Sequence, residues 1–369
     1  MSKIINIATA VPPHKHSQED ILQFMQCVYA LDAVGNRKLK FLYHHSSIDS
    51  RYSVIPEYSR SVPDWQFYPQ TENLEPFPSL EMRMQWFNKF APELSVNAIR
   101  NCLEETSLDK NDITHLITVS CTGMSAPGLD LQVMELLDLP NNIFRTSVNF
   151  MGCYAAIHAL KLANSICIAD DQAKVMIVCT ELCTLHFQRE SDPDNIAASL
   201  LFADGAAAVM VTGNSYKEEG LLIDGFYSEV LSKGKNDMSW ELSSKGFLMT
   251  LSGYVPELIE EDFHSLVSRA MKHYNAEKAQ INEWCIHPGG KRILEAIHKS
   301  LDLPENALQD SYNVLKEYGN MSSPTILFVL KDIMKKRLQN RDDCKIFGAA
   351  FGPGLTMETM LLERERRSS

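Results

Sequence analysis

The chain has 369 residues, of which 47 are Asp or Glu and 35 are Lys or Arg, so its net charge is −12 with neutral histidines. A hydrophobic share of 45% and a charged share of 22% exclude a mainly disordered chain, a collagen-like repeat and a coiled coil. The acidic balance argues against a nucleic-acid-binding protein, although a local basic patch can still bind an anionic ligand. At about 150 residues per domain, the length predicts two domains or one duplicated fold.

The chain is expected to be cytoplasmic and to lack a membrane span. No stretch approaches the about 20 apolar residues of a span, and the apolar start before Pro12 and Pro13 is too short for a secretory signal. The nine cysteines are an odd number without a Cys-x-x-Cys pair. We interpret them as thiols in a reducing compartment and expect no metal site.

Hydrophobic periodicity predicts strands that alternate with helices, which is typical of an α/β fold. The expected elements are a helix over 18–33 opening at Ser17, an irregular Pro-rich connection over 55–80, a helix over 81–108, a strand over 113–121, a helix over 130–137, a strand over 143–149, a helix over 153–168 and strands over 173–180 and 206–211. A polar joint at 217–220 separates an N-terminal half, 1–215, from a C-terminal half, 216–369.

The second half repeats the pattern of the first. Each half has a strand, Pro-Gly, a helix, the motif Leu-Asp-Leu-Pro-x-Asn and a strand-like run, followed by a glycine that opens a helix, at Gly152 or Gly319. This order predicts an internal duplication that places Cys153 and Asn320 at related positions. His287, at the end of the strand over 281–286, is expected to face the same centre.

Cys153, His287 and Asn320 are the candidate catalytic residues. A run of small helix formers follows Cys153, so we expect this cysteine at a helix N-terminus, where the dipole lowers the thiol pKa and favours the nucleophilic thiolate. Taken singly, each residue has a structural alternative: a buried cysteine, a core histidine bonded to a carbonyl group, and a helix N-cap asparagine.

Five segments together resemble the type III polyketide synthases, the chalcone-synthase-like group of the thiolase superfamily. They are Gly152-Cys153-Tyr-Ala, Leu201-Phe-Ala-Asp-Gly-Ala-Ala-Ala, Trp284-Cys-Ile-His-Pro-Gly-Gly, Glu317-Tyr-Gly-Asn-Met-Ser-Ser and Ala350-Phe-Gly-Pro-Gly. The resemblance covers nearly the whole chain, most weakly over 30–90. It implies a five-layered αβαβα fold, a homodimer, acyl-CoA and malonyl-CoA as substrates, and no metal or redox cofactor.

The implied reaction is a decarboxylative Claisen condensation followed by cyclisation or lactonisation. By resemblance, Cys153 would hold the starter and the growing chain as a thioester, and His287 would keep the thiol ionised. His287 and Asn320 would donate hydrogen bonds to the malonyl thioester oxygen as it becomes an enolate, a contribution of about 3–4 kcal/mol per donor. Phe202 matches the family's aromatic gate; its alternative is core packing.

Several positions depart from the plant pattern and predict a bacterial-type member with a differently shaped cavity. The position of the family's second gate phenylalanine corresponds to Met249, although Phe247 lies nearby. Trp240 replaces a small residue of the pocket, or alternatively packs in a surface flap. Pocket positions that are threonines in the plant enzymes correspond to Cys121, Cys183 and His186. For the phosphates of CoA, Lys40, with Lys38 nearby, and Arg51 are the candidates; each has a solvated-surface alternative.

Three alternative functions remain open at this point. A fatty-acid condensing enzyme like β-ketoacyl-(acyl carrier protein) synthase III uses the same Cys/His/Asn set but takes its extender from acyl carrier protein. A papain-like hydrolase has the same residue order, but Cys153 lacks the Cys-Gly-Ser-Cys-Trp surroundings and the duplicated halves have no place in that fold. A non-catalytic binding protein with the condensing fold would not need all three polar residues.

Overall fold

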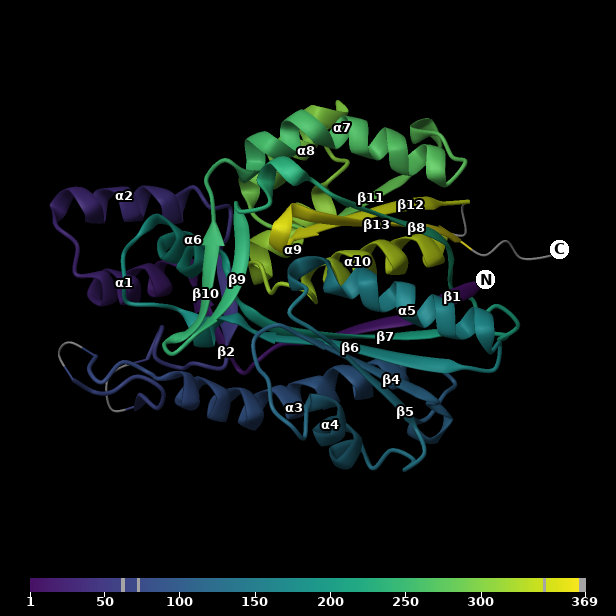
Figure 1. Ribbon diagram of the computed structural model, residues 1–369, viewed down its shortest axis with the longest axis horizontal. Coiled ribbons are helices and arrows are strands. Elements are labelled where there is room, and N and C mark those ends of the chain that lie inside the picture. The colour runs from purple at the N-terminus through teal and green to yellow at the C-terminus, as the bar shows by residue number, and fades with distance from the viewer. Residues whose placement is uncertain (61–63, 72–73, 341–342, 365–369) are drawn as a thin grey trace.

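The computed structural model describes residues 1–60, 64–71, 74–340 and 343–364, and it has five layers (Figure 1). The middle layer consists of α5 (Ala155–Ala169) and α10 (Thr325–Asn340). One sheet beside it contains β1 (Ser2–Ala10), β7 (Asp204–Gly213), β6 (Lys174–Leu182), β4 (His115–Ser120) and β5 (Phe144–Asn149), and the other contains β8 (Leu221–Val230), β13 (Thr356–Arg364), β12 (Lys345–Gly352) and β11 (Glu283–Ile286). The outer layers are α3 (Leu80–Glu104) with α4 (Leu129–Leu137), and α7 (Val255–His273) with α8 (Lys291–Leu301). The expected αβαβα arrangement is confirmed.

Strand pairing shows the duplication directly. In the first half β4 and β6 are parallel, whereas β6–β7 and β7–β1 are antiparallel. In the second half β11 and β12 are parallel, whereas β12–β13 and β13–β8 are antiparallel. A short antiparallel pairing of β1 with β8 joins the two sets. The repeat therefore holds for the architecture as well as for the sequence motifs.

Two predicted elements differ from the structure. The prediction of a strand-like run after residue 306 is wrong, because this segment forms the helix α9 (Gln309–Tyr318). Its buried residues Ser311, Val314 and Leu315 follow helical spacing. The prediction of a single helix over 18–33 is also wrong. It divides into α1 (Gln18–Tyr29) and α2 (Ala33–His44), because Ala30 adopts a left-handed conformation and Asp32 caps α2.

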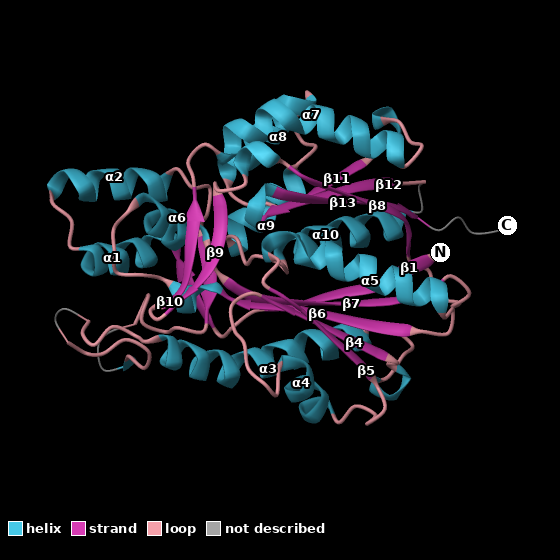
Figure 2. Ribbon diagram, viewed as in Figure 1, coloured by secondary structure: helices cyan, strands magenta, loops and turns pink. Residues whose placement is uncertain are grey.

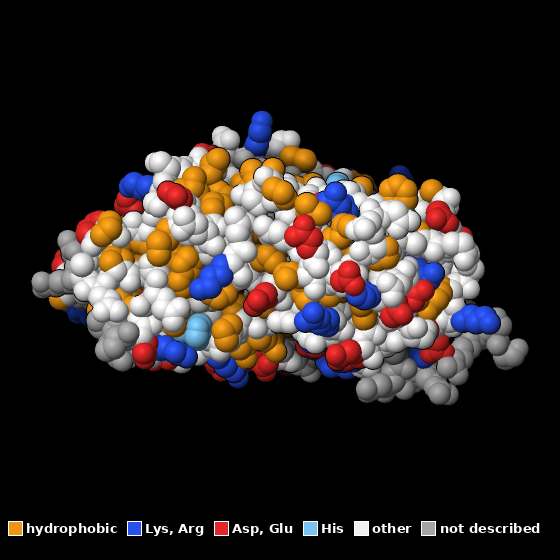
Figure 3. Space-filling model, turned by 90° about the horizontal axis from the view of Figure 1, so that it is seen from below, with side chains coloured by type: hydrophobic (Ala, Val, Ile, Leu, Met, Phe, Trp, Pro, Cys, Tyr) orange, Lys and Arg blue, Asp and Glu red, His pale blue; other side chains and the backbone are white. Residues whose placement is uncertain are grey.

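One end of the molecule consists of α1, α2, α6 (Pro193–Leu201) and a hairpin of β9 (Met238–Ser243) and β10 (Gly246–Leu251), as Figure 2 shows. A second small pair, β2 (His14–Ser17) with β3 (Ser50–Ser53), lies at the same end. From residue 55 up to the start of α3, the described part of this connection contains no helix or strand of more than three residues, and residues 61–63 and 72–73 lie outside that part. On the face formed by α3 and α4, both signs of charge are interspersed (Figure 3).

The segment Gly152–Ala169 is the one candidate for a membrane span among the described residues. By length and composition it is apolar enough to cross a membrane, with a mean hydropathy of 1.2. In the fold it is α5 with its preceding turn, and it lies between the two sheets (Figure 1). Its buried face is rich in alanine, at positions 155, 156, 159 and 163, which allows both sheets to approach the middle layer closely.

Candidate active site

The three candidate catalytic residues line one cavity of about 850 Å³ that receives residues from both halves. Cys153 lies in a 3₁₀ turn, Gly152–Tyr154, that leads into α5. His287 follows β11 directly, and Asn320 lies five residues before α10. The repeated architecture therefore brings the starts of the two middle-layer helices to the same place.

Cys153 is held in a tightly packed turn. Gly152 has a φ of 74°, and a Cβ atom at this position would lie 2.3 Å from Cδ of Pro353. Only glycine fits such a conformation and contact. The Phe-Gly-Pro-Gly loop thus forms one wall of the cavity, and its close approach explains the glycine before the cysteine.

Burial of Cys153 opposes the thiolate that the sequence predicts. Burial raises the pKa of Cys153 to about 12, and hydrogen bonds with Ser322 and Asn320 offset this only in part. The Sγ atom lies 3.7 Å from Oγ of Ser322. Its position before α5 is as expected, but loss of hydration in the cavity outweighs the helix terminus.

His287 is a neutral imidazole without a hydrogen-bond partner in the described structure. Its side chain is buried, neither Nδ1 nor Nε2 is bonded, and burial lowers its pKa to about 3. His287 is therefore not the core histidine bonded to a carbonyl group that the sequence left as an alternative. A buried, unpaired ring is costly, and it leaves both nitrogens available to a ligand.

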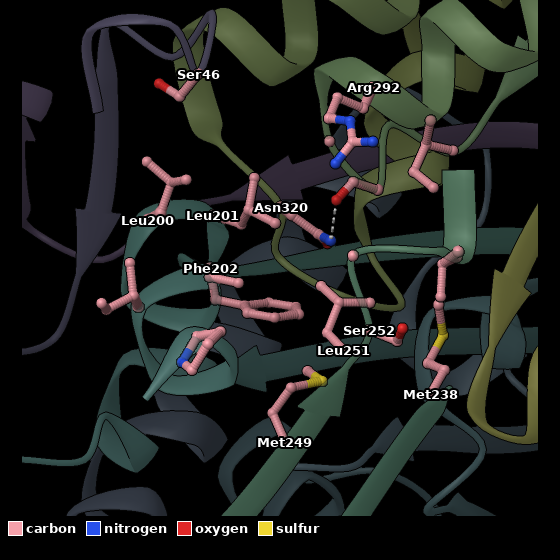
Figure 4. A pocket seen from close by; sticks show the side chains of 18 of the residues that line it. Ser46, Leu200, Leu201, Phe202, Met238, Met249, Leu251, Ser252, Arg292 and Asn320 are labelled. Carbon is pink, nitrogen blue, oxygen red and sulfur yellow. Dashed lines mark hydrogen bonds between the residues drawn. The ribbon is translucent and has the colours of Figure 1, made fainter. Parts of the chain in front are cut away.

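The amide of Asn320 is oriented by two hydrogen bonds. Its Oδ1 accepts from the Ser322 backbone N–H at 2.8 Å, and its Nδ2 donates to the Gly289 carbonyl at 3.2 Å (Figure 4). An amide nitrogen carries two hydrogens, so one N–H remains to donate towards the cavity. Asn320 is not a helix N-cap, because α10 begins at Thr325.

Phe202 is joined to Asn320 through the backbone and projects into the cavity (Figure 4). Its carbonyl accepts a 2.6 Å hydrogen bond from Arg51, whose Nε also donates to Gln18. Arg51 is 1% exposed. We therefore correct its assignment to CoA: the guanidinium supports the Phe202 segment from inside and is not accessible to a phosphate.

The cationic rim of the cavity also differs from the expectation. Lys40 is exposed on α2 and does not line the cavity, whereas Lys38 does. Lys291 and Arg292, at the start of α8, were not among the sequence candidates and also line the cavity. The sequence could have indicated these two residues, because they directly follow the His-Pro-Gly-Gly loop that carries His287.

The β9–β10 hairpin closes one side of the cavity. Trp240 and Met249 are paired across the hairpin, are half-buried and line the cavity. The indole Nε1 of Trp240 donates a 2.7 Å hydrogen bond to the Cys121 carbonyl, so the indole points inward. Cys121 and Cys183 are buried and also line the cavity.

His186 does not line the cavity, which corrects its assignment. Its ring stacks on Phe247, with 4.4 Å between ring centroids. Its Nε2 is bonded to the Thr122 carbonyl at 2.7 Å, and its Nδ1 accepts from the Phe247 N–H at 3.1 Å. The Nε2–H tautomer satisfies both bonds, and burial lowers the pKa of this ring to about 3. His186 therefore anchors the hairpin to the cavity wall.

Glu181 is an important residue that the sequence reasoning missed. It is fully buried, and it accepts hydrogen bonds from the Cys121 N–H, the Thr122 hydroxyl and the Ser323 hydroxyl. Burial raises its pKa to about 7. The carboxyl group connects the ends of β4 and β6 to the loop that carries Asn320. A lone acidic residue in the apolar run Val178-Cys-Thr-Glu-Leu was its only sequence signal.

Models of known families match both halves of the chain. Residues 1–215 match the N-terminal domain of chalcone and stilbene synthases, and residues 226–365 match the C-terminal domain. The chain belongs to the chalcone and stilbene synthase family.

Relatives with names support this assignment. "Type III polyketide synthase A" from Arabidopsis thaliana is 28% identical, over 97% of this chain and 92% of that protein. "Probable polyketide synthase 1" from Dictyostelium discoideum is 30% identical, and this chain spans only 11% of its length. The crystal structure of PKS-I from the brown alga Ectocarpus siliculosus superposes with a TM-score of 0.92 at 28% identity, over 99% of this chain and 98% of that one.

This membership identifies an acyltransferase of the type III polyketide synthase class, whose members condense malonyl-CoA units. A papain-like hydrolase is excluded, because the whole chain has the synthase architecture. The family match also favours a polyketide synthase over a fatty-acid condensing enzyme. The expected bacterial type stays a prediction.

Proposed function

We propose that Cys153 is the nucleophile that accepts the starter from an acyl-CoA. In this step Sγ bonds to the acyl carbon, the thiol proton passes to the neutral His287 ring, and the CoA thiolate leaves and takes that proton. The carrying observation is that one cavity is lined both by a thiol whose pKa burial raises and by a buried imidazole without a hydrogen-bond partner in the described structure. A thiol that starts protonated needs such a base.

Asn320 and His287 would then stabilise the enolate formed from malonyl-CoA. The carboxylate–methylene bond breaks, carbon dioxide leaves, and the electron pair moves onto the thioester oxygen. The enolate carbon attacks the thioester on Cys153, which releases the lengthened chain to the incoming CoA. The second N–H of the Asn320 amide and one ring N–H of His287 are the donors for that oxygen. The apolar Phe202 ring would disfavour the carboxylate and favour neutral carbon dioxide.

Lys38, Lys291 and Arg292 are our candidates to bind the phosphates of CoA. They are the lysines and arginines among the residues that line the cavity, and Lys38 and Arg292 are solvent-exposed. Arg292 pairs with Glu257 at 2.6 Å on the surface, an exposed ion pair of small energy that a phosphate can replace. They take the place of Lys40 and Arg51 in the original assignment.

The remaining parts of the proposal concern the assembly. The substrates are an acyl-CoA and malonyl-CoA, with no metal or redox cofactor and no nucleic acid, and the products are released by cyclisation or lactonisation in the cytoplasm. The N-terminal half, 1–215, supplies the cysteine, and the C-terminal half, 216–369, supplies the histidine and asparagine. The active unit is a homodimer; the exposed outer edge of β5 offers a place for a second copy.

Two half-reactions test the residue roles. Cys153→Ala should abolish acyl loading, measured by intact-protein mass, whereas the exposed Cys27→Ala should load normally. Asn320→Ala should lower carbon dioxide release from malonyl-CoA about 10²–10³-fold and impair loading much less; the exposed Asn313→Ala is its matched control. Equal damage to both half-reactions by Asn320→Ala would contradict the division of roles.

A further inference from the structure

Arg51 is a buried cation whose hydrogen-bond acceptors are uncharged. Only 1% of the residue is exposed. Its Nε donates to the Gln18 amide oxygen at 2.9 Å, its Nη1 donates to the Phe202 carbonyl at 2.6 Å, and its Nη2 has no partner in the described structure. A buried guanidinium that meets only neutral acceptors is costly. An apolar side chain of similar length would pack at a lower cost, so stability alone does not explain this arginine.

The segment that Arg51 holds also fixes the backbone of Asn320. The Asn320 N–H donates to the Leu201 carbonyl at 2.9 Å, and the Ala203 N–H donates to the Asn320 carbonyl at 2.9 Å. These two bonds form the parallel bridge between Phe202 and Asn320, whose side chains both face the cavity (Figure 4). The carbonyl of Phe202, between the two bonded residues, accepts from Arg51 instead. Loss of Arg51 would leave this carbonyl without that bond and the Asn320 backbone without that support.

Arg51 also packs directly against the turn that leads into Asn320. Gly319 has a φ of 68°, and a Cβ atom at this position would lie 2.8 Å from both Cγ and Cδ of Arg51. Only glycine fits such a conformation and contact. The aliphatic part of the arginine therefore contacts the residue before Asn320, while the guanidinium holds the strand end that is bonded to Asn320.

The backbone around Arg51 is fastened to the helix before this turn. The Asp49 N–H donates to the Lys316 carbonyl at 2.8 Å. The Ser50 hydroxyl donates to the Glu317 carbonyl at 2.9 Å. These bonds connect the start of β3 to the end of α9, so the Arg51 side chain extends from a fixed base to both active-site segments.

We propose that Arg51 is a positioning residue for the decarboxylation of malonyl-CoA and that it acts through the amide of Asn320. The inference rests on the proposed function, in which the second Asn320 N–H donates to the enolate oxygen. A displacement of about 1 Å at such a group can cost about 10²-fold in rate. Arg51 is not among the described residues that line the cavity, so it should affect the rate of this step and not the affinity for malonyl-CoA.

Separate measurement of the two half-reactions tests this role. Arg51→Met should lower kcat for carbon dioxide release from malonyl-CoA at least about tenfold and leave KM within about twofold. Loading of Cys153, measured by intact-protein mass, should stay close to the original rate. An unchanged kcat in the folded variant overturns the proposal.

Arg83→Met is the matched control. Arg83 is also a buried arginine, and its guanidinium donates to backbone carbonyls of another part of the fold, those of Pro78, Leu185 and Phe187. This variant should leave the ratio of decarboxylation to loading unchanged. If it lowers the ratio as much as Arg51→Met does, a general loss of packing explains the effect and the proposal is overturned.

Arg51→Lys repeats the test if Arg51→Met does not fold by its melting temperature. One ammonium group cannot reproduce the fixed pair of bonds that the guanidinium makes to Gln18 and Phe202. The kcat for decarboxylation should therefore fall in this variant too, by a smaller factor, and an unchanged kcat overturns the proposal in the same way.

A double-mutant cycle separates positioning from a merely structural role. Because the amide is then already absent, Asn320→Ala combined with Arg51→Met should release carbon dioxide as fast as Asn320→Ala alone, within about twofold. A further loss of about tenfold in the double variant would show independent effects and overturn the action through Asn320. If Asn320→Ala alone leaves carbon dioxide release unchanged, the proposed function itself is contradicted at Asn320.

Discussion

Burial disfavours the charged forms of both Cys153 and His287 in the resting cavity. An ion pair prepared in advance would keep the thiolate fraction nearly constant over the pH range in which the pair persists. A thiol with a pKa of about 12 instead depends on proton transfer at the moment of attack. The two arrangements predict different pH dependence.

The alkylation of Cys153 by iodoacetamide should accelerate with pH. Below its pKa of about 12, the thiolate fraction rises about tenfold per pH unit, so the rate constant should rise steeply between pH 7 and pH 9. Peptide mass spectrometry can follow this rate, with the exposed Cys27 as an internal reference for the reagent. A rate that does not change between pH 6 and pH 8 would show a thiolate–imidazolium pair.

Trp240 should limit the size of the product. Its ring lines the cavity, so Trp240→Gly should allow more extensions or bulkier starters, seen as higher product masses. The loss of a half-buried ring should cost about 1–3 kcal/mol of unfolding free energy, less than the about 3–5 kcal/mol of a fully buried one. Trp240→Phe keeps most of the volume but loses the N–H donor to Cys121. If it shifts product masses as far as glycine does, ring volume is not the cause.

Among the elements, the ends of β4 and β6 depend on the buried Glu181. Its pKa of about 7 lies above the ordinary value of 4.5 because burial favours the protonated carboxyl group. This stabilising contribution is complete below pH 4.5 and is lost as the pH rises through 7. The buried Asp204, whose pKa is raised to about 6, acts in the same direction at a slightly lower pH.

Glu181→Gln should therefore reduce the pH dependence of stability. Between pH 5 and pH 8 we expect the free energy of unfolding of the original protein to fall by about 1–3 kcal/mol relative to that of the variant, at about 1.4 kcal/mol per pKa unit. The variant should keep the contributions of Asp204 and of the buried His186 and His287, whose lowered pKa values act in the opposite direction. The exposed Glu135→Gln should leave the pH dependence of the original protein unchanged. Denaturant melts at several pH values measure these slopes, and equal slopes in all three proteins would refute the role.

For the whole molecule, the nine-stranded sheet of the described chain ends at β5, most of whose residues are exposed. Phe144 on this edge strand is 68% exposed. An exposed strand edge with apolar side chains is a typical site for pairing with another chain. This feature supports the proposed homodimer.

Phe144→Glu should convert the dimer to monomers, because it would place a charge within the strand contact. Sedimentation equilibrium should give twice 41.7 kDa for the original protein and a mass near the monomer for the variant. Phe41→Glu, at a similarly exposed phenylalanine on α2, should remain dimeric. A monomeric original protein would exclude the homodimer.

The sequence by itself determined the features that depend on local pattern. Alternating runs gave most strands and helices, Ser17 marked the start of α1, and paired motifs revealed the duplication. The motifs around Cys153, His287 and Asn320 carry their chemistry in residue type and order. These features are readable because backbone preference and side-chain chemistry act over a few neighbouring residues.

Only the tertiary structure decided which side chains reach the cavity and in which charge state. Arg51 donates a hydrogen bond to the carbonyl of Phe202, which lies 151 residues away in the sequence. His186 is hydrogen-bonded to partners that lie 61 and 64 residues away. Lys40 differs from Lys38 only in the face of α2 that it occupies. A helix start could be predicted for Cys153, but its raised pKa could not, because desolvation is summed over all atoms that the fold brings around the thiol.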